Sequence, residues 1–428
     1  MRIRMRIGLV VVATLVLAAA AACASSTTRR SGSPVASPAI GHHSVDLAAA
    51  KAARTSPEQL RAQFEQLLGQ HALLAVRVMR SVVLPASDFR QAATASLQQN
   101  TGALSRIVAS GYGRAQADRF TQLWQRHITD LLTYANAVAS RNAPAQQTAR
   151  TALMTDADAY GSWLAAASKG RIRASAAASV RMHVDELMQQ LDAYAARDYN
   201  RAYQIERPAY EHMFTAGATL AKGSLPPELA VGLDAAPSKL RSAFAMLLGE
   251  HLELIIDAQR ATFAGSPEFN AAGAQINANT TALAQAMGAI VGPPKAAEFQ
   301  SAWADHVDGL MAYTAAVAGR DAAGKAAAEN RLNSFAVTLA TYFSKVVRNQ
   351  LDVVPLTGAI TTHDQHLIDQ AEAYAAKDYA RAQQMELEGY RQMLGVANTL
   401  VDAIQRTVKP GLPAGGSQTG GGGTARRP

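Results

Sequence analysis

The feature that most constrains this 428-residue chain is that its central part occurs twice, about 180 residues apart. The segment LRAQFEQLLGQH, which ends at His71, matches LRSAFAMLLGEH, which ends at His251. The segment LWQRHITDLLTYANAVASRN from Leu123 likewise matches AWADHVDGLMAYTAAVAGRD from Ala302. A repeat of this length predicts two homologous domains, each with its own core. The joint falls at 223–237, where Gly and Pro residues exclude one continuous helix.

Each copy has the apolar spacing of α-helices. Apolar residues recur at steps of three and four, as around Trp124 and Trp303, and an alternation of period two is absent. Breakers such as the segment 141–144 divide each copy into three hairpins of about 56 residues. The sequence therefore predicts an all-α fold of two tandem homologous six-helix up-down bundles, each made of three α-hairpins. Copy 1 is expected at 56–222 and copy 2 at 238–408.

The N-terminus has the pattern of an export signal. Three Arg lie in the first six residues and are followed by sixteen residues without charge, Ile7 to Ala22. Sixteen is fewer than the about 20 apolar residues that span a membrane, so residues 1–22 are predicted to be a removable signal peptide. The only cysteine, Cys23, follows three Ala, as in a bacterial lipobox, and is expected to be the lipidated first residue of the mature chain. An ordinary secretory signal cleaved nearby is the alternative.

The segments outside the two copies are expected to be flexible. Residues 23–55, rich in Ser, Thr, Pro, Gly and Ala, are predicted to be a tether, and the Gly-rich residues 409–428 a disordered tail. The net charge of +8 comes from the ends of the chain, since residues 51–408 carry only +1. A nearly neutral body argues against a nucleic-acid partner. We therefore expect an exported protein, lipid-anchored through Cys23 on the outer face of the cytoplasmic membrane, or secreted in the alternative.

Histidines recur at a fixed interval on the predicted helices. His71, His127 and His183 are 56 residues apart, and each occupies an apolar position of its helix, so the three side chains should point inward. The residues that face them across the three hairpins have the same interval and are Asn100, Asp156 and His212. Because residues equidistant from a turn lie side by side in an antiparallel hairpin, all six are expected at one level of the core.

A layer of buried polar groups needs partners, because each unpaired one costs about 1–3 kcal/mol. Neutral imidazoles are common ligands of zinc and copper, and a carboxylate can join them. Asp130 and Glu186, three residues after His127 and His183, are candidates for further ligands or for acceptors that fix a tautomer. The alternative is a purely architectural layer, in which His–Asn, His–Asp and His–His hydrogen bonds set the register of the hairpins.

The second copy keeps the histidine series but loses part of the layer. It has His251, His306 and His363, with Asn279 opposite the first of them, and His366 replaces the glutamate of copy 1. The residues opposite the other two histidines are Phe335 and either Arg391 or Gln392. Because an aromatic ring cannot ligate and a cation would repel a metal ion, copy 2 is expected to be the weaker site.

The motifs LLGQH, LWQRHI and YEHM resemble those of a poorly characterised all-helical family of secreted proteins and lipoproteins from Gram-positive bacteria. Some of its members are found beside domains labelled copper amine oxidase N-terminal. The resemblance covers 57–222 and again 239–408, and it implies no activity. The positions to which it points are His71, His127, His183 and His212, with their counterparts in copy 2. The Asn-Tyr-acid motif that matures into the amine oxidase quinone is absent.

Motifs of common enzymes are also missing from the sequence, among them HExxH, GxSxG and GxxxxGK[ST]. The sequence therefore favours a non-catalytic, membrane-anchored protein that binds copper or zinc through an interior histidine layer. The alternative is a structural or interaction module of the cell envelope whose buried histidines are architectural. An oxidoreductase that uses the same ion ranks third, because no substrate-binding residue can be named.

Overall fold

The computed structural model describes residues 56–84, 87–173 and 176–408. Within these ranges the chain forms thirteen α-helices, one 3-10 helix and no strand, which confirms the all-α prediction. None of the helices in the described part of the chain is both long and apolar enough to cross a membrane. The predicted signal peptide, lipidated cysteine, tether and tail lie outside the described residues.

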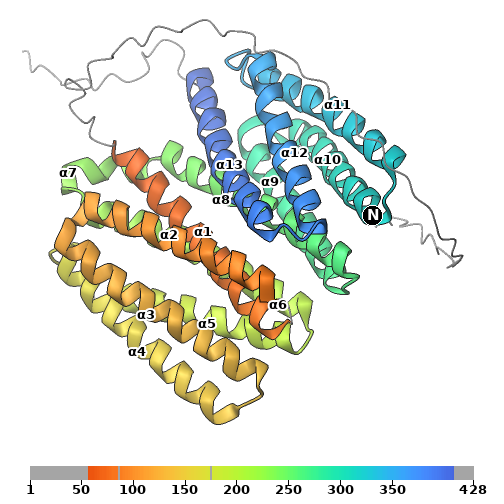
Figure 1. The fold of residues 1–428 in the computed structure, drawn as a ribbon. Coiled ribbons are helices and arrows are strands. Elements are labelled where there is room, and N and C mark those ends of the chain that lie inside the picture. The colour runs from red at the N-terminus through yellow and green to blue at the C-terminus, as the bar shows by residue number, and fades with distance from the viewer. Residues whose placement is uncertain (1–55, 85–86, 174–175, 409–428) are drawn as a thin grey trace, which may run out of the picture. The chain divides into compact units, whose positions relative to one another are not determined.

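The first copy contains six long helices. They are α1 (Pro57–Val83), α2 (Ser87–Tyr112), α3 (Arg114–Ala139), α4 (Ala143–Ala167), α5 (Ala176–Ala195) and α6 (Tyr199–Ser224). Each helix packs on the next, α6 packs on α1, and α1, α3 and α5 contact one another. The first helix of each hairpin is therefore an inner helix of the copy, and these inner helices are α1, α3 and α5. In Figure 1 these helices run in colour from orange to yellow-green.

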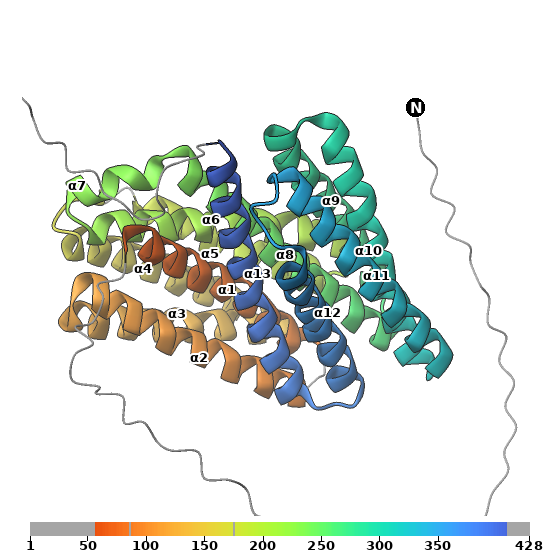
Figure 2. The same cartoon turned by 90° about the horizontal axis from the view of Figure 1, so that it is seen from above.

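The second copy repeats this pattern of contacts. Its long helices are α8 (Ala236–Ala264), α9 (Glu268–Val291), α10 (Pro293–Gly319), α11 (Ala322–Val346), α12 (Val353–Ala375) and α13 (Tyr379–Val408). Here α8, α10 and α12 contact one another, and α13 packs on α8. Figure 2 shows α10 and α11 running side by side. The joint is partly helical, with the short α7 (Pro227–Ala230) and a 3-10 helix (Val231–Asp234).

Several helices begin at residues that suit a helix N-terminus. Ser56 caps α1 by accepting a hydrogen bond from the backbone N–H of Gln59, whose side chain accepts one from Ser56 in return. The side chains of Asn142 and Asp198 cap α4 and α6 in the same way. These caps satisfy backbone donors that have no partner inside a helix. The cap of α4 lies in the segment 141–144, where the sequence predicts a break between helices.

Helices α1 and α8 are buried along most of their length and lie where the two copies meet. Several of their charged residues are therefore paired inside the protein. Arg77 of α1 forms ion pairs with Glu253 of α8 (2.6 Å) and with Glu386 of α13. Arg80 forms one with Glu206 of α6 (2.6 Å). Because a buried charge without a partner is strongly unfavourable, the two ion pairs of Arg77 hold the copies in one arrangement.

The same contact region contains a pair of equivalent tyrosines and close helix approaches. The hydroxyl groups of Tyr210 and Tyr390, which are 180 residues apart, hydrogen-bond at 2.8 Å. A Cβ atom at Gly249 would lie 2.5 Å from Oη of Tyr210, and one at Gly69 would lie 2.8 Å from Oη of Tyr390. Only glycine therefore fits at these two positions of α8 and α1.

Replacing Gly249 by alanine should destabilise the protein. The added methyl group would overlap two buried tyrosine rings, and overpacking of this kind costs about 1–3 kcal/mol. Gly273 of α9 is a matched control, because a Cβ there meets no atom within 4 Å. Gly273→Ala should raise the free energy of unfolding by about 0.5–1 kcal/mol through helix propensity. Urea denaturation measures both changes, and a Gly249→Ala variant as stable as the parent would contradict the close packing.

Candidate metal centre

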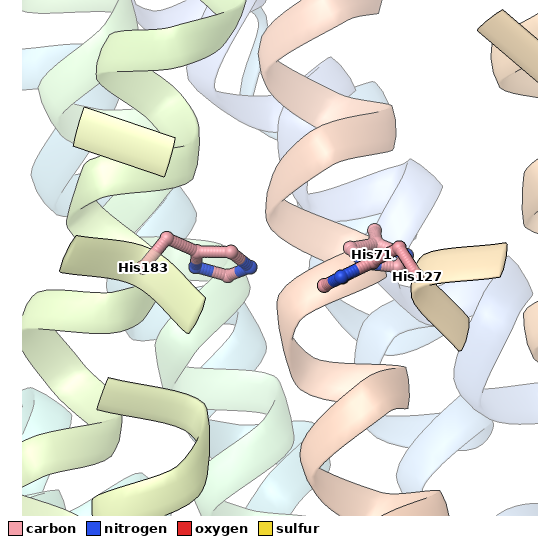
Figure 3. Close-up of side chains that lie close together, drawn as sticks. All are labelled: His71, His127 and His183. Atoms are coloured by element: carbon pink, nitrogen blue, oxygen red, sulfur yellow. The ribbon is translucent and has the colours of Figure 1, made fainter. Parts of the chain in front are cut away.

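The inner helices of the first copy bring three histidines together, which we name the first triad: His71 of α1, His127 of α3 and His183 of α5. One ring nitrogen from each lies within 4.8 Å of the other two. The ring centroids are 5.7 to 6.4 Å apart. Figure 3 shows the imidazole of His183 directed toward those of His71 and His127. The structure thus gathers the three histidines that the 56-residue interval places at one level of the core.

The second triad consists of His251 of α8, His306 of α10 and His363 of α12. Its ligand nitrogens also lie within 4.8 Å of one another. The three ring centroids are separated by 5.6, 5.6 and 5.7 Å, so this triad is more compact and more regular than the first. All three of its side chains are buried.

Burial without hydrogen-bond partners is the main electrostatic property of both triads. Neither ring nitrogen of His71, His183 or any member of the second triad has a partner. The backbone of Ala209 lies near His183 but outside hydrogen-bonding geometry. Burial lowers the pKa of His127 to about 4 and that of His183 to about 3. The imidazoles are therefore neutral at pH 7, the form that binds metal ions.

A tryptophan lies against each triad. The ring of Trp124, one turn before His127 on α3, is 4.4 Å from that of His71 between centroids. In the second copy, the ring centroids of Trp303 and His251 are 4.8 Å apart. The sequence shows these residues only as apolar positions of a helix. The structure adds that each indole ring lies against a histidine of its triad.

The asparagines predicted to face the triads bond to the neighbouring helix instead. Nδ2 of Asn100 donates to the backbone oxygen of Leu67 (2.9 Å) and to Oε1 of Gln70 (3.1 Å). Asn279 donates to the equivalent backbone oxygen in α8 and to Oε2 of Glu250 (2.7 Å). Both asparagines therefore lie at the expected level of the core, but neither bonds to a histidine.

The other predicted members of the first layer also pair among themselves. Asp156 pairs with Arg126, and the pKa of Asp130 is raised to about 6 by burial and by the nearby carboxylate of Asp156. Nδ1 of His212 lies 2.8 Å from Oε2 of Glu186. These four predicted site residues lie beside the first triad. None of them belongs to the group of residues whose ligand atoms could bind one ion.

Each copy nevertheless has a buried carboxyl group beside one histidine of its triad. That histidine is His127 of α3 in copy 1 and His306 of α10 in copy 2. In copy 1 this carboxyl group is that of Asp156, whose charge raises the pKa of that histidine against the effect of burial. In copy 2 the equivalent residue is Phe335, which stacks on His306 with 4.4 Å between ring centroids. Asp364 of α12 supplies the carboxyl group there, with Oδ1 3.4 Å from Nδ1 of His306. Its counterpart in copy 1 is Val184, so comparing the two copies in the sequence could have found it.

The expectation that Arg391 repels a metal ion in copy 2 is wrong. Arg391 is exposed on α13, where its Nε donates to the backbone oxygen of Leu387. The next residue, Gln392, faces inward instead and its Oε1 lies 3.0 Å from Nδ1 of His366. His366 therefore lies beside the second triad rather than in it. The stated electrostatic reason for a weaker second site does not hold.

The fold and the site define an all-helical protein with two buried histidine triads. No protein-family model matches the chain, and no curated protein or solved structure gives a match. The family suggested by the sequence motifs thus stays a prediction.

Acid should destabilise the metal-free protein through the triads. His183 stays neutral in the folded chain to about pH 3, whereas an unfolded histidine titrates at about pH 6.5. Below pH 6.5 the unfolded state binds more protons, so the free energy of unfolding falls as the pH falls. Between pH 7 and pH 5 the loss from one such residue is about 2 kcal/mol.

We expect His183→Gln to lose about 2 kcal/mol less than the parent between these two pH values. Urea denaturation of both proteins at pH 7 and pH 5, with a chelator present, measures the difference. The comparison isolates one histidine, because the buried carboxyl groups that titrate in the opposite sense are the same in both proteins. Equal losses would mean that His183 is not held neutral in the folded state.

Proposed function

We propose that the protein binds a metal ion, copper or zinc, in each histidine triad and has no catalytic role. The observation that carries this proposal is the convergence of three neutral, buried imidazoles whose nitrogens lie within 4.8 Å of one another. Ligand nitrogens of a tetrahedral zinc ion are about 3.4 Å apart, given bonds of about 2.05 Å. Small side-chain rotations would close the remaining gap.

The donor set suits these metals. Imidazole nitrogen is a good ligand for zinc, copper, iron and nickel, whereas magnesium and calcium prefer oxygen. The carboxyl group of Asp364 lies next to His306, where an acceptor would fix the tautomer and present the other ring nitrogen to an ion. Three protein ligands leave room for a fourth from outside the chain.

The architectural alternative predicts hydrogen bonds that the structure does not contain. In that hypothesis Asn100, Asp156 and His212 hold the three histidines in register. Their side chains instead bond to Gln70, Arg126 and Glu186. A layer kept only for its architecture would leave its buried nitrogens unpaired, at about 1–3 kcal/mol each. This difference favours metal binding.

Metal analysis of the full chain, made without a His-tag, tests the proposal. After removal of metal and dialysis against zinc or copper, we expect two ions per chain, one for each triad. His183→Gln and His363→Gln should each remove one of the two, because two remaining imidazoles hold an ion far more weakly than three. The double variant should bind none tightly.

Histidines beside the triads supply matched controls. His212→Gln and His366→Gln remove imidazoles that bond to Glu186 and Gln392 instead of joining a triad. Both variants should keep two ions per chain. Absence of stoichiometric metal in the parent, or the same loss in control and triad variants, would leave the architectural alternative standing.

We also propose that the protein is exported and anchored by a lipid on Cys23. The basic N-terminus, the short uncharged run after it and the small residues before the cysteine support this proposal. A single lipid-modified residue would hold the mature chain at the outer face of the cytoplasmic membrane.

Cys23→Ala should move the protein from the membrane fraction to the medium or leave it unprocessed, because the acylated thiol is lost. Fractionation of cells that express the parent and the variant, followed by immunoblotting, gives the result. Cys23→Ser is a second variant of similar size that also lacks the thiol. Membrane association of both variants at the parental level, in the processed form, would contradict the lipid anchor.

A further inference from the structure

The second copy encloses an apolar cavity beside its triad, with a volume of about 310 Å³. Two histidines, His306 and His363, form part of its wall, and all six long helices of that copy contribute to it. Most of the wall is aromatic or aliphatic, and its large side chains include Phe299, Trp303, Leu339, Phe343 and Ile360. Cavities of roughly 300–1,000 Å³ are the size of small-molecule sites.

Within the described residues, the first copy has a smaller space at the equivalent place. Its cavity measures about 100 Å³. Tyr160 stands where copy 2 has Leu339, and its ring packs against that of Trp163 with 5.2 Å between centroids. The cavity therefore follows from substitutions in the second copy and not from the repeated architecture.

The chemistry of the wall restricts what the cavity can hold. None of the described residues that line it is Lys, Arg, Asp or Glu, so a charged ligand would be buried without a partner. Both of its histidines lack hydrogen-bond partners, but His306 stacks on Phe335 and lies beside Asp364. The imidazole left for a ligand is therefore that of His363, which is 3% exposed. A neutral imidazole can accept a hydrogen bond from a hydroxyl group.

Size and access complete the description of the ligand. The cavity has about twice the volume of an apolar cavity of about 150 Å³ that binds benzene, so it can accept two fused rings. Gly395 and Thr399 of α13 line the cavity and are exposed on the surface. A ligand can therefore enter along α13.

We propose that this cavity binds a neutral aromatic molecule of about two rings whose single hydroxyl group donates a hydrogen bond to His363. The site goes beyond metal binding and does not rest on it. Because a neutral imidazole has a single acceptor nitrogen, the hydroxyl group and a metal ion would compete for His363. The cavity wall and the imidazole are both present in the metal-free protein, so a chain that binds no metal would still bind this ligand.

Isothermal titration of the metal-free full chain with 2-naphthol tests the proposal. We expect binding of one molecule per chain, and binding of naphthalene that is weaker by about 2–10-fold, because it lacks the hydroxyl group. Ionised 2-naphthoate should bind more weakly still, since its carboxylate would be buried without a cation. Equal affinity for all three compounds would overturn the role of His363 and of the apolar wall.

Leu339→Tyr fills the cavity with the residue that copy 1 has at this place, and should weaken 2-naphthol binding at least about tenfold. Val337→Tyr adds the same ring on α11 at a position that is 51% exposed, and should bind like the parent. Ala359→Phe fills the cavity from α12 in case the first variant does not fold. No binding by the parent, or parental affinity in a folded cavity-filling variant, would overturn the proposal.

Discussion

The burial of α1 and α8 is the constraint on which the rest of the structure depends. Each of these helices is surrounded by its own copy on one side and by the other copy on the opposite side. Arg77 and Arg80 of α1 therefore cannot reach water, and both pair with carboxylates from other helices. Arg77 does so with Glu253 and Glu386, which come from the second copy. Because breaking a buried ion pair typically costs about 3–5 kcal/mol, these residues determine how the copies pack.

The triads are the exception to this rule of pairing. The buried arginines have carboxylate partners, whereas His71 and His251, on the same two helices, have none at either ring nitrogen. Burial lowers the pKa of both histidines well below the ordinary value, and the neighbouring histidines lower it further. A metal ion bound at this point would convert unpaired nitrogens into ligands. The cores would then be completed by the ion they are proposed to bind.

The sequence predicts the all-α class and the triads because both depend on regular spacing. Apolar steps of three and four indicate helices, and a 56-residue interval places one histidine on the first helix of every hairpin. What it could not predict depends on which way a side chain turns. Arg391 and Gln392 are adjacent in the sequence, yet only the second faces inward. The bonds of Asn100 to Leu67 and Gln70 and the carboxyl group of Asp364 likewise need the packed helices.

The pairing of Tyr210 with Tyr390 has a consequence for how the two copies relate. Residues 180 positions apart meet each other, and the contact between Gly69 and Tyr390 is matched by one between Gly249 and Tyr210. This is the reciprocity of an isologous interface, in which the same patch serves both partners about a two-fold axis. A single copy would thus expose a surface complementary to itself. Joining the copies in one chain makes their association intramolecular, at an effective concentration of millimolar order for a short linker. Each copy can then acquire its own substitutions while the two stay associated.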